Sequence, residues 1–172
     1  EGAISDYSKA IEIDPNYVNA FNGRGLAKSY LKDYKGAISD YSRAIEIAPN
    51  DFNAFYNRGF AKYDLKNYEG AILDISLAIE IDPNHGDAYF LRGVAKSELK
   101  DYDEAILDYT KAIEIDPNDF KVYHNRGVAK QNLNDYEDAI PDFTKAIELN
   151  AKKDGQNALS TRRPRRRANR RR

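Results

Sequence analysis

The sequence "AIEIDPN" stands at residues 10–16 and recurs unchanged at 78–84 and 112–118, while "AIEIAPN" occupies 44–50. The prolines of these copies, Pro15, Pro49, Pro83 and Pro117, are each 34 residues apart. A fixed interval of this length indicates one supersecondary unit that is copied along the chain. We therefore divide the chain into a half unit and four full units, which are 1–16, 17–50, 51–84, 85–118 and 119–152.

Apolar residues recur at helical spacing in the second half of every unit. In the first full unit they are Ala37, Ile38, Tyr41, Ala44 and Ile45, and residues 3–13 carry the same pattern. Their spacing is the 3.6-residue period of an amphipathic helix, and the first half of each unit is also predicted to be helical. The Pro-Asn step ends the second helix because proline cannot continue a helix. The pattern predicts an all-α chain with two helices in each unit.

Two features predict how the helices begin and pack. The second helices are preceded by side chains that favour the N-cap, and Asp101 with Glu104 matches a capping box. These N-caps are Asp33, Asn67, Asp101 and Asp135. Glycine inside a helix costs about 1 kcal/mol relative to alanine, so a regularly placed glycine predicts close helix packing. These glycines are Gly25, Gly59, Gly93 and Gly127.

The units resemble the tetratricopeptide repeat (TPR) family over residues 1 to about 152. The resemblance rests on Gly25, Ala37, Tyr41, Ala44 and Pro49, which stand at the family's small, small, aromatic, small and proline positions. It implies an α-solenoid, in which helix pairs stack into a right-handed superhelix with a concave groove lined by the first helices. It also implies a non-catalytic scaffold or adaptor that binds a protein or peptide in this groove.

The resemblance places a set of first-helix residues in the groove. Aromatic side chains there suit large apolar contacts, and asparagines can bond a peptide backbone. The expected groove residues are Asn22, Leu26, Tyr30, Asn53, Tyr56, Asn57, Phe60, Tyr63, Phe90, Leu91, Val94, Lys121, His124, Asn125 and Val128. We expect a partner to dock mainly against Tyr56, Phe60, Phe90 and Leu91. The alternative is that Phe60 and Phe90 only pack between repeats.

The chain departs from the family where each first helix carries an arginine and a lysine four residues apart. These pairs are Arg24 and Lys28, Arg58 and Lys62, Arg92 and Lys96, and Arg126 and Lys130. An acid recurs in the second helices at Asp6, Asp40, Asp74, Asp108 and Asp142. Charges on a partly apolar helix face must be paired or reach solvent. We predict an Arg–Asp ladder between repeats, for example from Asp40 to Arg58, and the alternative is that both side chains are solvated.

The last unit is irregular, because Pro141 falls inside its second helix and Ala151 replaces the closing proline. Pro141 is expected to kink or loosen the start of that helix. Neither end of the solenoid has a clearly polar outer face, so end-to-end self-association is a further expectation. The alternative is that sequence outside this piece covers the ends.

Charge divides the chain into two parts. Residues 152–172 hold ten basic residues and one acid, so they carry +9, while residues 1–151 hold 17 basic and 27 acidic residues and carry −10. We expect 153–172 to be a disordered arginine-rich tail. Its arginines, which suit phosphate contacts with RNA or DNA and could also meet an acidic protein, are Arg162, Arg163, Arg165, Arg166, Arg167, Arg170, Arg171 and Arg172. Alternatives are a targeting signal, contact with the acidic repeats, or an artefact of the sequence.

Several function classes find no support in the composition. There is no cysteine, and the two histidines, His85 and His124, lie on different repeats without metal-ligand spacing. We therefore expect no enzyme, no metal and no cofactor. No apolar run reaches the roughly 20 residues that span a bilayer, so no membrane partner is expected. The sequence has no methionine and opens within a repeat, so we interpret it as a piece of a longer protein and leave its compartment open.

Overall fold

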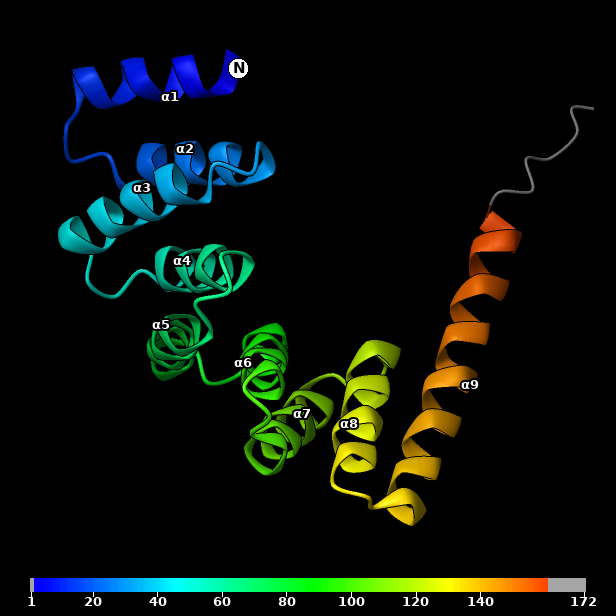
Figure 1. Cartoon of the computed structure of the whole chain (residues 1–172). Coiled ribbons are helices and arrows are strands. Elements are labelled where there is room, and N and C mark those ends of the chain that lie inside the picture. The colour runs from blue at the N-terminus through cyan, green and yellow to red at the C-terminus, as the bar shows by residue number, and fades with distance from the viewer. Residues whose placement is uncertain (1, 161–172) are drawn as a thin grey trace, which may run out of the picture.

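A computed structural model describes residues 2–160, and within this range the chain is helical without strands (Figure 1). The helices are α1 (Gly2–Ile13), α2 (Val18–Tyr30), α3 (Tyr34–Ile47), α4 (Phe52–Asp64), α5 (Tyr68–Ile81), α6 (Gly86–Glu98), α7 (Tyr102–Ile115), α8 (Phe120–Asn132) and α9 (Tyr136–Ser160). Each full repeat contributes a first and a second helix, and α1 is the second helix of the half repeat. The predicted all-α class is confirmed.

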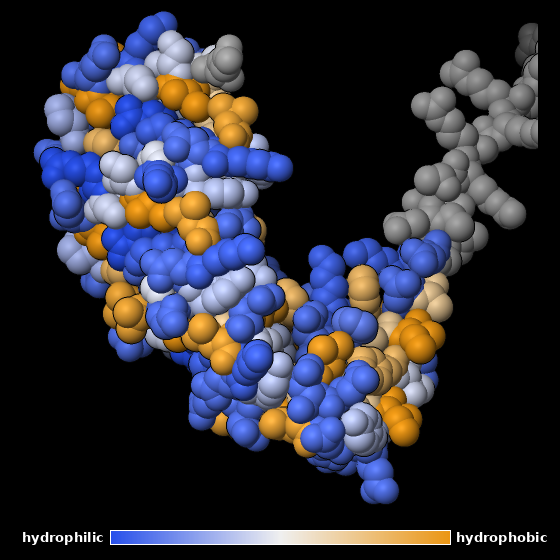
Figure 2. Space-filling view, in the orientation of Figure 1, coloured by the Kyte–Doolittle hydropathy of each residue, from blue (hydrophilic) through white to orange (hydrophobic). Residues whose placement is uncertain are grey.

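The helix pairs stack side by side into a curved solenoid. Every helix packs against its neighbours in sequence, and the first helices α2, α4, α6 and α8 also contact one another in series. The first helices therefore line the inner side of the curve, and the second helices α3, α5 and α7 lie outside them (Figure 1). Figure 2 shows the molecule hollowed on this inner side, between the arm of α1 to α5 and α9.

The Pro-Asn steps end the second helices as expected, at Ile13, Ile47, Ile81 and Ile115. Asp33 and Asn67 cap the helices that follow them, because their side chains accept hydrogen bonds from the amides of Gly36 and Gly70. Asp101 makes no such bond. Glu104 instead pairs with Lys96, with 3.3 Å between Nζ and Oε2. The capping box predicted for Asp101 and Glu104 is therefore wrong.

A tight turn joins the two helices of each repeat, and one residue of it has a positive φ. These residues are Lys32 (62°), Lys66 (62°), Lys100 (65°) and Asn134 (63°). A residue in this left-handed conformation often follows the end of a helix. It is usually glycine, because residues with a Cβ are disfavoured in that conformation. The amide of the next residue then bonds back to the first helix, as Asp33 does to the Lys28 carbonyl at 2.9 Å.

The predicted glycines lie where the two helices of a repeat cross. A Cβ added to Gly25 would lie 2.7 Å from the Tyr41 ring, and one added to Gly93 would lie 2.7 Å from the Tyr109 ring. Real Cβ contacts are longer than this, so the helices could not approach as closely with alanine at these positions. The core between the helices consists largely of small residues, such as the fully buried Ala37.

The C-terminal helix is longer than predicted. Because Ala151 stands where proline ends the earlier second helices, α9 continues to Ser160. Residues 153–160 are therefore helical, and not part of a disordered tail. The helix also runs through Pro141 without interruption, and Ala139 and Asp142 beside it remain buried. The predicted tail arginines, from Arg162 onward, lie outside the described residues.

Candidate partner-binding groove

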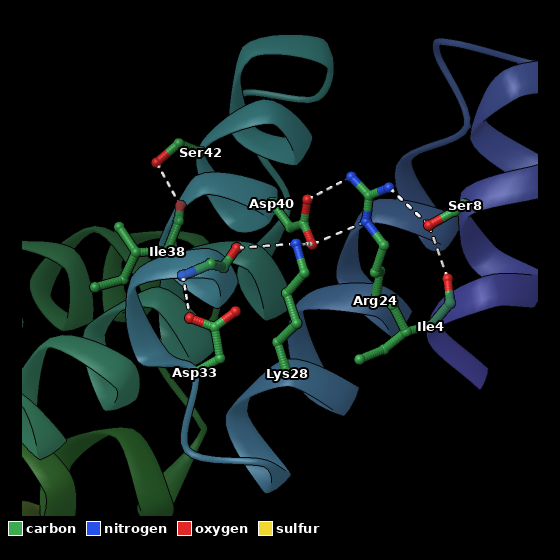
Figure 3. Close-up of polar contacts among 9 residues, drawn as sticks. Ile4, Ser8, Arg24, Lys28, Asp33, Ile38, Asp40 and Ser42 are labelled. Atoms are coloured by element: carbon green, nitrogen blue, oxygen red, sulfur yellow. Dashed lines mark hydrogen bonds and ion pairs between the residues drawn. The ribbon is translucent and has the colours of Figure 1, made fainter. Parts of the chain in front are cut away.

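A cluster of three charged side chains fixes each first helix against the second helix of its repeat (Figure 3). Arg24 donates from Nε and Nη2 to the two carboxylate oxygens of Asp40, at 3.0 and 2.7 Å. Lys28 Nζ lies 2.7 Å from Asp40 Oδ2, and Asp40 is only 4% exposed. The same ionic cluster recurs as Arg58, Lys62 and Asp74; Arg92, Lys96 and Asp108; and Arg126, Lys130 and Asp142.

The predicted arginines do form ion pairs with the aspartates of the second helices, but the predicted pairing between repeats is wrong. Each arginine meets the aspartate of its own repeat, so Asp40 pairs with Arg24 and not with Arg58. The contact between repeats is made by the third guanidinium nitrogen, because Arg24 Nη1 donates to Ser8 Oγ of the preceding second helix at 3.1 Å. Arg58 reaches Ser42 in the same way. The guanidinium thus links three helices.

The ionic cluster is electrostatically satisfied. Burial disfavours the charged carboxylate of Asp142, but hydrogen bonds from Arg126 and Lys130 outweigh this effect, so the pKa of Asp142 is lowered from its ordinary value of 3.8. Bidentate contacts from arginine are among the stronger hydrogen bonds in proteins. These charges are occupied within the repeat, so we assign them to the scaffold and not to ligand binding.

A cleft of about 270 Å³ opens on the inner side between α2 and α4. It is lined by Leu26, Ser29, Tyr30, Tyr41, Tyr56, Asn57 and Phe60, and we call this set the α2–α4 groove. Five of its members are predicted groove residues. Leu26 is 43% exposed, Tyr30 80% and Phe60 43%, so large apolar surface faces solvent here. Two further lining residues, Ser29 on α2 and Tyr41 on a second helix, were not among the predicted groove residues.

Two tyrosines, the buried Tyr41 and the half-buried Tyr56, form part of the wall of this cleft. Burial, with a smaller contribution from the charge of Asp87, raises the pKa of Tyr56 to about 12. Burial likewise raises the pKa of Tyr41. The Tyr56 ring is held by Phe52, at 5.6 Å between centroids, and by His85, also at 5.6 Å. Both hydroxyls therefore stay protonated at neutral pH, and the groove keeps a rigid wall.

Three of the predicted groove residues pack in the interior between repeats. Leu91 is 6% exposed and belongs to the core between α5 and α6, so its placement in an open groove is a correction to the prediction. Phe90 and Val94 are half-buried against the core between α7 and α8. The Phe90 ring lies 6.0 Å from that of Tyr109, which fits the alternative that Phe90 packs between repeats.

Several predicted amide and aromatic side chains already have partners inside the chain. Asn22 donates to Asp51 Oδ2 at 2.6 Å, and Asn125 donates to the Lys121 carbonyl at 2.8 Å. The Tyr63 ring lies 5.5 Å from that of Tyr68. Of the remaining members, Asn53 and Lys121 are exposed and Val128 is half-buried.

The predicted residue His124 belongs to a second cleft, far along the solenoid. This cleft of about 710 Å³ lies between α8 and α9 and is lined by Phe120, His124, Phe143, Ala146, Ile147, Asn150, Ala151 and Asp154. The His124 ring packs at 5.7 Å from Phe143, and Ile147 is largely exposed. The structure thus separates the predicted set into the α2–α4 groove and residues near the C-terminal end.

The described part of the chain offers little for other chemistry. Between residues 2 and 160, no three His, Cys, Asp or Glu side chains gather as metal ligands. No helix in the same range has the length and apolar character needed to cross a membrane.

Comparisons with known proteins agree with this architecture. Stacked helix pairs with an inner groove define the class of α-solenoid repeat proteins that serve as protein-interaction scaffolds. The chain belongs to the tetratricopeptide repeat family, whose models match it at residues 1–29, 30–66, 52–85, 86–119 and 120–153. Among curated proteins, none matches the chain.

Solved structures share the fold. A crystal structure of MamA is 26% identical, with a TM-score of 0.85 over 88% of this chain and 89% of that chain. A MamA fragment from Desulfovibrio magneticus RS-1 is 24% identical, with a TM-score of 0.83 over 88% and 85%. YrrB, described as a TPR protein with an unusual peptide-binding site, is 25% identical, with a TM-score of 0.76 over 85% of this chain and 75% of its own.

Proposed function

We propose that this protein is a scaffold that binds a short segment of a partner protein in the α2–α4 groove. The observation that carries the proposal is the exposure of Leu26, Tyr30 and Phe60 around one cleft. Large hydrophobic side chains that stay exposed together on a folded surface mark interaction sites more often than chance exposure does. Aromatic anchors in such a cleft typically supply most of the binding energy.

The polar groups of the groove support recognition of a peptide backbone. Asn57 lines the cleft and carries both an amide donor and a carbonyl acceptor. The hydroxyl of Tyr56 remains protonated at neutral pH and can donate to a peptide carbonyl. A hydrophobic side chain in the cleft and backbone hydrogen bonds around it would fix a peptide in one register.

The charge of the repeats favours certain segments over others. Residues 1–151 carry a net charge of −10, so their field attracts cations and repels anions. We therefore infer that the bound segment carries a hydrophobic anchor flanked by neutral or basic residues. The likeness to YrrB, whose description names a peptide-binding site, supports the same class of ligand.

Selection of peptides on the intact chain tests the proposal. A phage library of random 12-residue peptides is panned on residues 1–172, and the affinities of selected peptides are measured by fluorescence polarisation. The double variant Tyr30→Ala and Phe60→Ala should weaken binding at least tenfold, because it removes two exposed anchors of the groove.

A matched control uses large exposed side chains on second helices. Leu73 and Leu107 are 67% and 62% exposed on α5 and α7, away from the groove lining. The variant Leu73→Ala with Leu107→Ala should leave affinity unchanged. Equal affinity of the selected peptides for both double variants would place their site elsewhere and contradict the proposal.

A further inference from the structure

The second helix α5 carries an unusual row of side chains along its outer face. Four residues at helical spacing form this row, and all of them are exposed: Glu69, Leu73, Leu77 and Glu80. Leu73 is 67% exposed, and Leu77, one turn later, is 40% exposed. We call these four residues the α5 stripe. It lies in the middle of the described chain, on the outer side of the solenoid (Figure 1).

Other second helices carry a basic residue where α5 has Leu77. In α3, α7 and α9 this residue pairs with a glutamate three positions later. The pairs are Arg43 with Glu46 at 2.8 Å, Lys111 with Glu114 at 2.9 Å, and Lys145 with Glu148 at 3.8 Å. In α5 the glutamate is kept as Glu80, but leucine replaces its cation. Within residues 2–160, Glu80 takes part in no ion pair.

A cleft of about 470 Å³ opens beside the C-terminal half of the α5 stripe. It lies between α5 and the turn that leads into α4, and it is lined by Pro49, Asn50, Phe55, Leu77, Glu80 and Ile81. Most of this lining is apolar, and Glu80 is its one charged member. A hydrophobic side chain of a partner can therefore enter the cleft while a cation beside it reaches Glu80.

The charge of the α5 stripe indicates which kind of partner fits. Large apolar side chains that stay exposed beside a cleft are typical of interaction sites. A second α5 stripe placed against the first would bring carboxylates against carboxylates, and like charges opposed across an interface are unfavourable. A segment with lysine or arginine beside its apolar residues would instead neutralise the two glutamates. Charge complementarity thus favours a basic partner over a second molecule of this chain.

We propose that the α5 stripe and its cleft form a second docking surface, which binds a basic amphipathic segment of another protein. One apolar side chain of that segment fills the cleft, and a second covers Leu73. A lysine or arginine of the segment pairs with Glu80. Because this surface lies on the outer side of the solenoid and the α2–α4 groove on the inner side, the two sites bind partners independently.

Peptide selection on a chain without the groove anchors tests this surface. A phage library of random 16-residue peptides is panned on residues 1–172 carrying Tyr30→Ala and Phe60→Ala. The library is first depleted on the same chain with Leu77→Lys added. This change gives α5 the lysine–glutamate pair that α7 already has, so the fold should tolerate it. The surviving peptides should be rich in apolar and basic residues.

Matched variants then locate the site of the selected peptides by fluorescence polarisation. Leu73→Ala should weaken binding about tenfold, because it removes an apolar contact of the stripe. Leu107→Ala, at the equivalent position of α7 and 62% exposed, should leave binding unchanged. Glu80→Gln should weaken binding about threefold, since an exposed ion pair contributes modestly. Glu114→Gln should have no effect, and circular dichroism checks that every variant is folded.

Any of three results would overturn the proposal. The first is that no peptide survives the depletion on Leu77→Lys. The second is equal affinity of the selected peptides for the Leu73→Ala chain and its parent. The third is a dimer in analytical ultracentrifugation that Leu77→Lys dissociates, which would make a second molecule of this chain the occupant.

Discussion

At the residue scale, the buried aspartate of each repeat decides how the two helices meet. Asp74 is 2% exposed and is held by Arg58 and Lys62 together. Removing one partner of a buried ion pair typically costs 3–5 kcal/mol, because a charge is left uncompensated, although an apolar substitute for the whole set can be as stable. The ionic cluster therefore specifies register more than it adds net stability.

The lowered pKa of Asp142 predicts acid sensitivity. A carboxyl whose pKa is lower in the folded chain stabilises the fold above its unfolded pKa, and this contribution is lost as pH falls through the folded pKa. The stabilisation by Asp142 should therefore be complete above about pH 5 and fade progressively below about pH 4. Urea unfolding between pH 2 and 7 should show a smaller pH dependence for Asp142→Asn than for the unchanged chain.

Glu12→Gln provides the comparison, because Glu12 is exposed and lies in none of the ionic clusters. Its urea midpoints should follow those of the unchanged chain across the pH range. If Asp142→Asn also followed them, the carboxylate would not be coupled to folding.

At the element scale, the sequence predicted the second helices because the apolar period indicates their length and the Pro-Asn step marks where they end. It did not predict the pairing of Asp40, because equivalent arginines precede and follow that residue and spacing alone cannot choose between them. The positive φ of Lys66 was also unpredictable, since lysine gives no signal of a left-handed turn. Tertiary packing imposes both features.

Gly59→Ala should destabilise the repeat in which α4 crosses α5. An added Cβ would lie 2.7 Å from Ile75 Cγ1 and 3.3 Å from the Ala71 carbonyl oxygen, and Ile75 is fully buried. Overpacking of this kind costs about 1–3 kcal/mol. Alanine regains about 1 kcal/mol of helix propensity, so a net loss of about 1 kcal/mol is expected in urea unfolding.

Gly2→Ala is the matched substitution, since nothing lies within 4 Å of a Cβ at that position. It should leave the free energy of unfolding unchanged or slightly higher. A stabilised Gly59→Ala protein would show that α4 and α5 can separate without cost.

At the scale of the whole molecule, the curvature of the solenoid decides which side chains line the same cleft. The sequence pattern does not show this curvature, so the groove residues could be predicted only in part. Leu26 and Phe60 occupy equivalent positions in neighbouring repeats, so the repeat resemblance could bring them together. His124 occupies the position equivalent to Tyr56 two repeats later, yet it borders a different cleft. Leu91 replaces a polar residue at the position of Asn57, and its burial follows from packing that the sequence pattern does not contain.

The arginine-rich segment predicts a nucleic-acid contact that is independent of the groove. If the eight arginines at 162–172 bind phosphates, single-stranded RNA affinity should fall with salt at a log–log slope on the order of −6. Filter binding of poly(U) between 50 and 200 mM salt measures this slope. Removal of 161–172 should abolish binding, and equal RNA affinity of the shortened chain would rule the contact out.

The near identity of the ionic clusters has a consequence for assembly. Each first helix presents the same arginine and lysine, and each second helix offers the same aspartate, so any of these partners could be exchanged between repeats at little energetic cost. The ionic cluster sets the register of a helix pair, while covalent connection, which gives adjacent helices a high effective concentration for each other, decides which helices pair. At high protein concentration, the same interchangeability favours domain swapping, in which two molecules exchange equivalent helices. The exchanged segments would be offset by whole repeats of 34 residues.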